Sequence, residues 1–403
     1  MTERRTPLYD YHARHAELVK GGGDYLFPLS YANPADEHLN TRLNVGMQDL
    51  STMGEVDLKG PGAERLINRL LVNDVRDMLS GQVRYGTMVN PNGGIVDDVT
   101  VYKFNDEHWM IVTSSAPRKK SARWIAEHAI GMSAYATDLT GAIALLSVQG
   151  PRSREFLKNV AQDVDMDALK FFHFGRAQIN GTELLLSRSG YTGELGYELY
   201  VPSEEATGVW EFLLKSGKDF GLRPYGTAAM QSLRIEKGLP LAGPDISDDE
   251  LHTPFHFGLD RWIRFDKHDF VGREALLREQ SRGLSERWVG LVLDGELAAR
   301  PGALIYSVDD ISSQTRTVKS GVRAGEPIPL KSSGHLVGRV TSSAKGHSVG
   351  KMLALAFVRT SHTFGGCHVL VDVEGSLQSG KVAPTPFFDP TGMRLRGKTG
   401  SGR

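Results

Sequence analysis

Alternating apolar and polar positions divide residues 55–137 into short extended segments, and apolar residues spaced three and four apart mark two helices between them. Strands mixed with amphipathic helices over about 80 residues predict a compact α+β unit. The predicted strands are Val56–Lys59, Val83–Val89, Ile95–Phe104 and Trp109–Thr113, and the predicted helices are Gly62–Leu71 and Lys119–His128.

Residues 138–275 continue this mixture, whereas the chain before residue 55 is polar and glycine-rich and predicts no clear element. The predicted strands here are Ile143–Val148 and Glu183–Ser187, and the predicted helices are Ser153–Val160, Glu205–Ser216 and Thr227–Lys237.

Beyond Ser285 the helical spacing disappears, and short strands separated by glycines predict an all-β domain, either a barrel or a sandwich. Polar residues 311–326 predict an irregular loop, and the ending from Met393 predicts a frayed basic tail. The predicted strands are Trp288–Leu293, Leu304–Tyr306, Leu336–Thr341, Leu353–Val358 and His368–Val373.

The length and charge of the chain narrow the class of protein. Its 403 residues exceed the ~250–300 at which a single core usually stops growing, so two or three domains are expected. No apolar run reaches the ~18 residues of a membrane span. The formal net charge is −1, with lysine and arginine spread along the chain, which predicts no surface for nucleic acid or an anionic membrane. A small molecule is the expected partner.

The chain contains one cysteine, Cys367, so it forms no internal disulfide, and its first residues lack the apolar segment of a secretory signal. Both features favour the cytoplasm. Cys367 enters a predicted strand as a small hydrophobic residue. The pairs His12 with His15 and His252 with His256 have spacings that suit metal ligands, but no cysteine cluster supports either pair, so no metal site is expected.

Two adjacent carboxylates, Asp97 and Asp98, lie inside the predicted strand that follows the turn at Asn90–Gly94. Side chains alternate between the faces of a strand. The mostly apolar face contains Ile95, Asp97, Val99 and Val101. The face that gathers a carboxylate, a hydroxyl and a phenol contains Val96, Asp98, Thr100 and Tyr102. Solvated aspartates at the start of a hairpin are the alternative, but strands are depleted in aspartate, which favours residues held by partners or by a task.

A second glycine-rich turn, Gly190–Gly193, feeds a strand in which Glu198 and Tyr200 share one face. Tyrosines stack on flat rings, and a carboxylate accepts two hydrogen bonds from an amidine-like N–H edge, so these walls suit a heteroaromatic ligand. The alternative is an ion pair between Glu198 and an arginine such as Arg234.

The chain resembles the aminomethyltransferase, or T-protein, family of tetrahydrofolate enzymes from Thr6 to Phe388, on motifs that occur in order. These motifs are Gly46-Met-Gln-Asp-Leu-Ser-Thr-Met53, Asn73-Asp-Val, Tyr85, Asn92-Gly-Gly-Ile-Val-Asp-Asp98, Val148-Gln-Gly-Pro, Ser189-Gly-Tyr-Thr-Gly-Glu, Gly196-Tyr-Glu198, Arg234-Ile-Glu-Lys-Gly238 and Phe270-Val-Gly-Arg-Glu-Ala-Leu276. Each motif alone is weak, but together they are specific.

The resemblance implies an α+β multidomain fold in which three domains form a ring around a central folate channel. In this scheme residues 1–54 and 138–275 form a discontinuous folate-binding α+β domain, residues 55–137 form the α+β domain with the catalytic aspartate, and residues 276–403 form a C-terminal β-barrel domain. The resemblance also implies tetrahydrofolate as the cofactor and Asp98 as the catalytic carboxylate near N5 of the pterin. The residues implied to bind folate are Met53, Tyr85, Tyr102, Tyr191 and Glu198.

Two departures from the family concern positions that would face the one-carbon donor. Thr52 stands where the family has histidine, and Met230 stands where aminomethyltransferases usually carry arginine, with Gln231 in place of aspartate. Losing fixed cations makes a pocket more apolar. A methionine at helical spacing also suits simple core packing, so the role of Met230 stays open.

Three functions follow from the resemblance. The departures favour a tetrahydrofolate-dependent demethylase that moves a methyl group from a small N-, O- or S-methylated compound to N5. The second is aminomethyl transfer in glycine cleavage, from an aminomethyl-lipoyl carrier protein, with methylenetetrahydrofolate and ammonia as products. The third is a non-catalytic folate-binding protein. At N5 a positioned carboxylate is needed because the nitrogen sheds a proton as it takes up the one-carbon unit.

Overall fold

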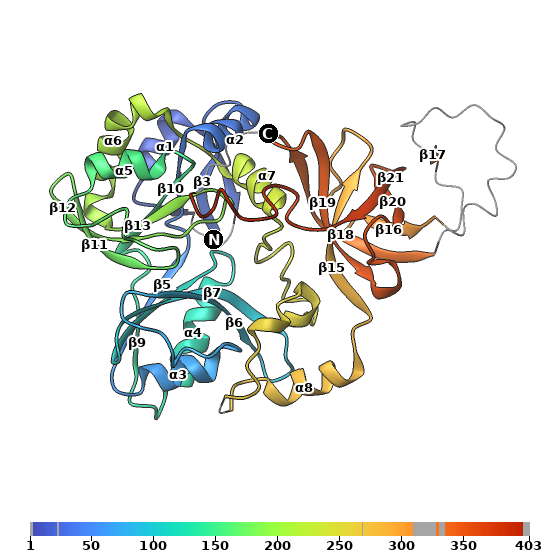
Figure 1. Cartoon of the computed structure of the whole chain (residues 1–403), viewed down its shortest axis with the longest axis horizontal. Helices are drawn as coiled ribbons and strands as arrows, with labels where there is room; N and C mark the ends of the chain where they lie inside the picture. The colour runs from blue at the N-terminus through green and yellow to red at the C-terminus, as the bar shows by residue number, and fades with distance from the viewer. Residues whose placement is uncertain (1–2, 22–23, 268, 309–327, 330–334, 398–403) are drawn as a thin grey trace, which may run out of the picture. The chain divides into compact units, whose positions relative to one another are not determined.

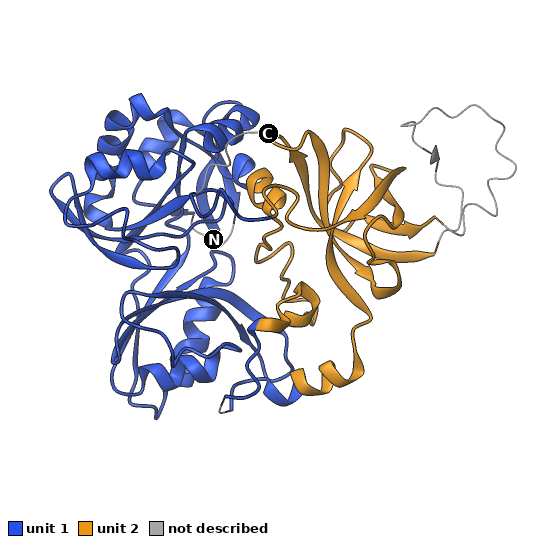
Figure 2. Cartoon of the chain, in the orientation of Figure 1, with its two compact units in different colours: residues 1–230, 262–275, 391–403 blue, residues 231–261, 276–390 orange. Residues whose placement is uncertain are grey.

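The computed structural model describes residues 3–21, 24–267, 269–308, 328–329 and 335–397. The chain divides into two compact units, which Figure 2 shows in different colours. Unit 1 contains residues 1–230, 262–275 and 391–403, and unit 2 contains residues 231–261 and 276–390.

Within the described residues, five strands of unit 1 form one antiparallel sheet in the order β6-β7-β8-β5-β9. Their bounds are β5 Gly54–Lys59, β6 Val83–Val89, β7 Ile95–Asn105, β8 His108–Thr113 and β9 Tyr135–Asp138. Helices α3 (Ala63–Leu70) and α4 (Arg118–Ala129) cover one face (Figure 1). In α3 the buried apolar residues Ala63, Leu66, Ile67 and Leu70 recur at helical spacing, so one stripe of this helix packs on the sheet.

A second sheet of unit 1, of six strands in the described part of the chain, has the order β11-β12-β13-β10-β4-β14. Its strands are β4 Val45–Asp49, β10 Ile143–Gln149, β11 Phe174–Ile179, β12 Thr182–Ser187, β13 Gly196–Pro202 and β14 Leu222–Pro224. Helices α5 (Ser153–Val160) and α6 (Ala206–Ser216) pack on one face through a core that includes Phe156 and Trp210. A small sheet of β1 (Arg4–Arg5), β2 (Glu17–Gly21) and β3 (Tyr25–Ser30) and the helices α1 (Tyr9–His15) and α2 (Pro34–Leu43) precede it.

The two larger sheets of unit 1 meet at a shared apolar cluster. The cluster joins Val83, Tyr102, Met110 and Val112 of one sheet to Leu145 and Tyr200 of the other. Unit 1 is therefore layered as helices, sheet, sheet and helices, and the inner layer contains two tyrosines whose hydroxyls need partners.

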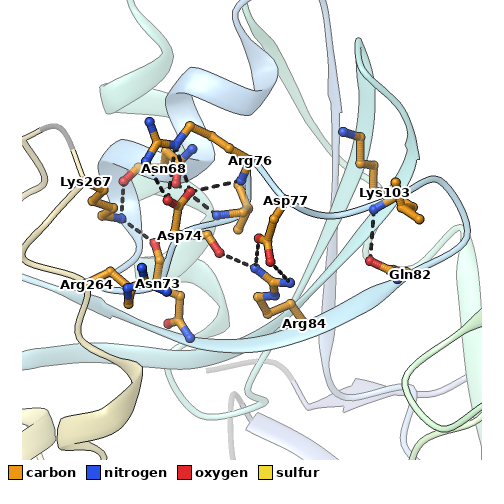
Figure 3. A network of polar contacts seen from close by, with 12 residues as sticks. Asn68, Asn73, Asp74, Arg76, Asp77, Gln82, Arg84, Lys103, Arg264 and Lys267 are labelled. Atoms are coloured by element: carbon orange, nitrogen blue, oxygen red, sulfur yellow. Dashed lines mark hydrogen bonds and ion pairs between the residues drawn. The ribbon is translucent and has the colours of Figure 1, made fainter.

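Residues 262–275 return to unit 1 and are fixed there by a buried lysine. The Nζ of Lys267 donates to the backbone oxygen of Asn68 at 2.7 Å, to that of Leu71 at 2.5 Å and also to that of Asn73 (Figure 3). One ammonium group therefore satisfies three carbonyls, one in the last turn of α3 and two in the connection that follows it.

Unit 2 contains a closed barrel. Among the described residues, six antiparallel strands follow each other as β15-β19-β18-β16-β20-β21, and β21 pairs back to β15. The strands are β15 Glu286–Leu293, β16 Leu304–Ser307, β18 Leu336–Gly346, β19 Lys351–Arg359, β20 His368–Val373 and β21 Ser376–Ala383, and the two-residue strand β17 (Ile328–Pro329) adds to β21. Closure leaves no exposed edge between β15 and β21. Cys367 is buried in the core of this barrel, as predicted.

The mixed α and β elements and the C-terminal barrel confirm the predicted fold class. The helices Ser153–Val160 and α7 (Thr227–Lys237) have the predicted bounds. The sequence did not predict the elements before residue 54, nor β9, β11, β14, β21 and α8 (Arg273–Arg282). The predicted loop 311–326 lies outside the described residues. The division into 1–54 with 138–275, 55–137 and 276–403 stays a prediction.

One prediction at the C-terminus is wrong for the described part of the chain. The segment Met393–Gly397 is not frayed, because Nε of Arg394 donates to Oε1 of Glu194 at 2.8 Å and to Oε2 at 3.0 Å. Glu194 is fully buried, so its carboxylate requires a partner that solvent cannot supply.

Candidate functional site

The aspartate pair follows a tight turn. The side chain of Asn90 accepts the backbone N–H of Asn92 at 2.9 Å and that of Gly94 at 3.2 Å. Gly93 has a φ of 86°, a conformation that glycine adopts without strain. The chain leaves this turn as β7, which confirms the predicted strand.

One position in the predicted alternation of β7 is wrong. The pairing of β6 with β7 shifts between Met88 and Val89, so the chain contains a bulge beside Val96. Val96 consequently belongs to the same apolar cluster as Val99 and Val101, although strict alternation assigned it to the opposite face. After the bulge the alternation holds.

Asp97 is fully buried on the face that α4 covers, so the alternative of a solvated aspartate is wrong for this residue. Its Oδ2 accepts the hydroxyl of Ser121 at 2.6 Å and the backbone N–H of Ser114 at 3.2 Å. Burial, and then the neighbouring carboxylate of Asp98, raise the pKa of Asp97 well above its ordinary value, against the effect of these hydrogen bonds. The carboxyl group of Asp97 therefore holds a proton more readily than an ordinary aspartate does.

Asp98 is half-buried on the other face and is held at both carboxylate oxygens. The phenol of Tyr85 donates to its Oδ2 at 3.2 Å, and the hydroxyl of Ser114 donates to its Oδ1 at 3.2 Å. Burial, the Asp98 carboxylate and, more weakly, Tyr191 raise the pKa of Tyr85 well above its ordinary value. Tyr85 therefore stays a neutral hydrogen-bond donor, and Tyr191 lies in the same electrostatic environment.

Glu198 is also half-buried, and its Oε2 accepts the hydroxyl of Ser189 at 2.5 Å and that of Tyr200 at 3.4 Å. Burial raises the pKa of Glu198, and the hydrogen bonds of these hydroxyls oppose the rise. The alternative partner, Arg234, instead donates to Asp245 at 2.6 Å inside unit 2. The predicted face shared by Glu198 and Tyr200 is confirmed.

Tyr102 lies on the same strand as Asp98 and contacts the residues around Glu198. It is fully buried, and its hydroxyl lies 2.7 Å from that of Tyr200 and 3.3 Å from that of Ser187. Tyr102 and Asp98 point to the same face of β7 about 13 Å apart along the strand, at ~3.3 Å per residue. The structure thus assigns Tyr102 a supporting position beneath Tyr200 and Glu198 rather than an exposed wall.

Thr52 and Met53 lie on a turn at the start of β5. The hydroxyl of Thr52 is 2.7 Å from that of Ser115, the residue after Ser114. Met53 is half-buried and packs on the apolar cluster that contains Tyr102 and Tyr200. Thr52, which is predicted to face the donor, is thereby connected through two consecutive serines to Asp98.

A buried polar chain holds this turn. Oδ1 of Asp49 accepts the hydroxyl of Ser51 at 2.5 Å, and Oδ2 of Asp49 lies 2.9 Å from Nε2 of His12. Nδ1 of His12 in turn lies 2.8 Å from the hydroxyl of Tyr31. Burial acts to raise the pKa of Asp49, but the hydrogen bonds and charge of His12 and the bonds from Ser51 outweigh it and lower the pKa.

Met230 lies half-buried on α7 and is not part of the apolar cluster that contains Met53 and Tyr102. Its role toward a donor stays a prediction. A hollow of about 560 Å³ lies elsewhere in unit 1 and contains none of the predicted site residues. Its lining is formed by Glu64, Arg65, Asn68, Arg69, Arg76, Lys267 and Asp269.

The histidine pairs do not gather a metal-ligand set in the described part of the chain, where no group of three or more His, Cys, Asp or Glu side chains could hold a metal ion. His12 bonds to Asp49, whereas the ring of His15 stacks on Tyr11 with centroids 4.2 Å apart. None of the helices in the described residues combines the length and apolar composition that a membrane crossing requires.

Sequence reasoning missed the serines that hold the carboxylates. Ser189 stands at the start of a quoted motif, where its place just before the glycine-rich turn was an available signal. Ser114 and Ser115 directly follow the predicted strand Trp109–Thr113. Their position, a polar pair at the end of a strand that neighbours the strand with Asp98, was the only sign of their role. Ser121 gave no signal, because its role depends on how α4 packs.

Models of known families match nearly the whole chain. Residues 8–267 match the model of the GCVT N-terminal domain. Residues 287–389 match the model of the glycine cleavage T-protein C-terminal barrel domain.

Individual relatives are similar over their full lengths. The aminomethyltransferase of Halothermothrix orenii is 33% identical over 96% of this chain and 100% of its own, and that of Moorella thermoacetica is 33% identical over 96% and 98%. The crystal structure of the glycine cleavage system aminomethyltransferase T from Bartonella henselae has a TM-score of 0.83 at 26% identity and covers 96% of this chain and 99% of its own.

Proposed function

Since the chain belongs to the aminomethyltransferase, or glycine cleavage T-protein, family of tetrahydrofolate-dependent one-carbon transferases, we propose that it transfers the aminomethyl carbon of a lipoyl carrier protein to tetrahydrofolate. The observation that carries the proposal is the carboxylate of Asp98, held by Tyr85 and by Ser114, whose neighbour Ser115 pairs with the hydroxyl of Thr52. Ammonia is released in this reaction.

The residues present fit a pterin. Asp98, Tyr85, Tyr191 and Glu198 are all half-buried, so each keeps surface for a ligand. Neighbouring side chains hold the polar groups of Asp98, Tyr85 and Glu198. Two carboxylates separated by neutral phenols and an apolar cluster suit a flat heteroaromatic ring with N–H groups on its edge. Tetrahydrofolate would supply N5 as the nitrogen that accepts the one-carbon unit.

Each side chain then has a definable task. Asp98 would accept the proton that N5 sheds, or stabilise positive charge that develops there, because neutral donors orient both of its oxygens. Burial raises the pKa of Asp97 well above its ordinary value, which disfavours a second negative charge beside Asp98. Glu198 accepts N–H groups of the ring edge, oriented by Ser189 and Tyr200.

The relatives support the aminomethyl donor. Aminomethyltransferases align with 96% of this chain, so both the folate side and the donor side of the fold have counterparts in them. A lipoyl carrier protein is therefore the proposed partner. The cytoplasmic location expected from the sequence stays a prediction.

A demethylase acting on a small methylated compound is the second candidate, and one observation favours it. At the donor position the structure has a neutral hydroxyl pair, Thr52 with Ser115, instead of an imidazole. A pair of hydroxyls carries no permanent charge. Such a pair suits a small uncharged methyl donor better than a fixed positive charge at this position would.

The deciding experiment identifies the folate product. The purified protein is incubated with tetrahydrofolate and either aminomethyl-lipoyl carrier protein or a panel of N-, O- and S-methylated compounds, and folates and ammonia are quantified. Asp98→Asn is the test variant. Asp106→Asn is the matched control, because Asp106 lies at the other end of the same hairpin with its side chain 90% exposed.

Methylenetetrahydrofolate with ammonia, absent in Asp98→Asn and retained in Asp106→Asn, is the expected result. Formation of 5-methyltetrahydrofolate from a methylated compound would contradict aminomethyl transfer and identify the protein as a demethylase. Binding of tetrahydrofolate without any product would leave the third reading, a non-catalytic folate-binding protein.

A further inference from the structure

The C-terminal segment Thr391–Gly397 belongs to unit 1, although the barrel that precedes it belongs to unit 2. Its most extensive side-chain contact is made by Arg394. The guanidinium of Arg394 donates from Nε to both oxygens of Glu194, at 2.8 and 3.0 Å, and from another nitrogen to the backbone oxygen of Arg42. This segment therefore reaches a carboxylate that is itself fully buried.

A second arginine, Arg42, also donates to the carboxylate of Glu194. Nη1 of Arg42, which is 3% exposed, donates to Oε1 of Glu194 at 3.0 Å and to the backbone oxygen of Thr192 at 2.8 Å. Burial raises the pKa of Glu194, and Arg42 and Arg394 oppose the rise. Two arginines, one from α2 and one from the C-terminal segment, therefore contact this carboxylate and favour its charged form.

Glu194 is the next-to-last residue of loop 189–195, which lies on the folate side of the proposed site. The loop starts at Ser189, whose hydroxyl donates to Glu198, and it carries Tyr191, which lies near Tyr85. Its middle is fixed by the hydroxyl of Thr192, which accepts the N–H of Glu194 at 3.2 Å. A displacement at Glu194 is therefore expected to reach Tyr191 and also Ser189, whose hydroxyl orients Glu198.

A second contact reinforces the first. Nη2 of Arg188, the residue before the loop, donates to the backbone oxygen of Arg396 at 3.1 Å. A Cβ added at Gly397 would lie 3.3 Å from Leu195 Cδ2, so the segment packs directly on the far end of the loop. The C-terminal segment holds loop 189–195 at both ends.

We propose that Arg394 is a positioning residue for folate binding, which acts through Glu194 on the loop that presents Ser189 and Tyr191. This assignment rests on the proposed function. The C-terminal segment would then contribute to the site, because its Arg394 provides Glu194 with a second cationic partner beside Arg42 of α2.

The test is calorimetric titration of the full-length protein with tetrahydrofolate under reducing conditions. In Arg394→Ala we expect about tenfold weaker binding, the scale of one lost charge-assisted hydrogen bond. Turnover at saturating tetrahydrofolate should stay near the wild-type value, because Asp98 and its two donors are untouched. A merely structural role would lower the melting temperature and leave the dissociation constant unchanged.

Arg396→Ala is the matched control, because the side chain of Arg396 bonds to Thr391 within the segment while its backbone oxygen keeps the contact with Arg188. Glu194→Gln keeps the shape of the buried side chain and provides a second variant. The double variant Arg394→Ala with Glu194→Gln should bind no more weakly than the poorer single variant, since both remove the same interaction.

Binding by Arg394→Ala equal to that of Arg396→Ala would overturn the assignment while the proposed function stands. Wild-type protein that shows no binding of tetrahydrofolate would overturn the proposed function and this assignment together. Additive effects in the double variant would also contradict it, because Arg394 would then act by a route other than Glu194.

Discussion

Ser114 holds both members of the aspartate pair, with its hydroxyl 3.2 Å from Oδ1 of Asp98 and its backbone N–H 3.2 Å from Oδ2 of Asp97. The hydroxyl orients the carboxyl group of Asp98, and the N–H binds that of Asp97, whose pKa burial raises well above its ordinary value. A single residue at the end of β8 therefore fixes which way the two carboxyl groups point.

Ser114→Ala should reduce kcat about tenfold, the scale of one hydrogen bond to a charged group, with little change in tetrahydrofolate affinity. The N–H to Asp97 survives the change, so the fold should be retained. Steady-state kinetics with a parallel binding titration checks this. Equal losses in Ser114→Ala and in Ser281→Ala, an exposed serine on α8, would show that the hydroxyl has no role in orienting Asp98.

Thr52→Val should weaken the apparent affinity for the one-carbon donor several-fold and leave tetrahydrofolate binding intact. Valine keeps the shape of threonine but cannot pair with Ser115, so one hydroxyl of the donor position is left without its neighbour. The measurement compares KM for the donor with the dissociation constant of tetrahydrofolate. If the folate constant changes and the donor KM does not, Thr52 lies on the folate side.

Much of the site followed from the two-residue period of strands. That period assigned Asp98 and Tyr102 to one face of β7 and Glu198 and Tyr200 to one face of β13, and the structure confirms both pairs. It failed at Val96, because a bulge adds a residue to one strand and no local signal marks it. The contact of Ser114 with Asp98 depends on the register between β7 and β8. The alternation of side chains along one strand does not reveal that register.

Helix α2 shows why the N-terminal elements were missed. Its buried residues are polar, namely Glu37, His38, Asn40, Thr41 and Arg42, while Leu43 is 68% exposed. A helix that packs through hydrogen-bonded polar side chains has no apolar stripe for a sequence pattern to reveal. The same reasoning applies to the C-terminal segment, whose basic residues suggested solvent but serve the buried carboxylate of Glu194.

His12→Ala should destabilise the protein by about 3–5 kcal/mol, the cost of leaving a buried carboxylate without its partner. Asp49 is fully buried and its pKa is lowered, so its charge in the folded state depends on His12 and Ser51. Chemical denaturation gives the free energy of unfolding. His15→Ala is the control, because His15 lies three residues further along the same helix and is exposed. Comparable stabilities of the two variants would mean that the pair contributes little.

Glu55 predicts how stability depends on pH. It is 1% exposed on β5, its Oε1 lacks a hydrogen-bond partner among the described residues, and burial, then the charge of Asp138, raise its pKa from 4.5 to about 8. The folded state therefore holds a proton that the unfolded chain has lost between these values. The stabilising contribution is complete below about pH 4.5 and disappears as the pH rises to about 8.

Glu55→Gln is neutral at every pH and should remove this contribution to the pH dependence. We expect it to melt at a higher temperature than the wild type at pH 8 and to differ little at pH 5, where wild-type Glu55 is already protonated in the folded state. Thermal unfolding at pH 5, 6.5 and 8 provides the comparison, with the exposed Glu127→Gln as control. Parallel curves for wild type and Glu55→Gln would mean that Glu55 stays ionised in the folded protein, because the buried Arg118, whose charge lowers the pKa of Glu55, then outweighs the effect of burial.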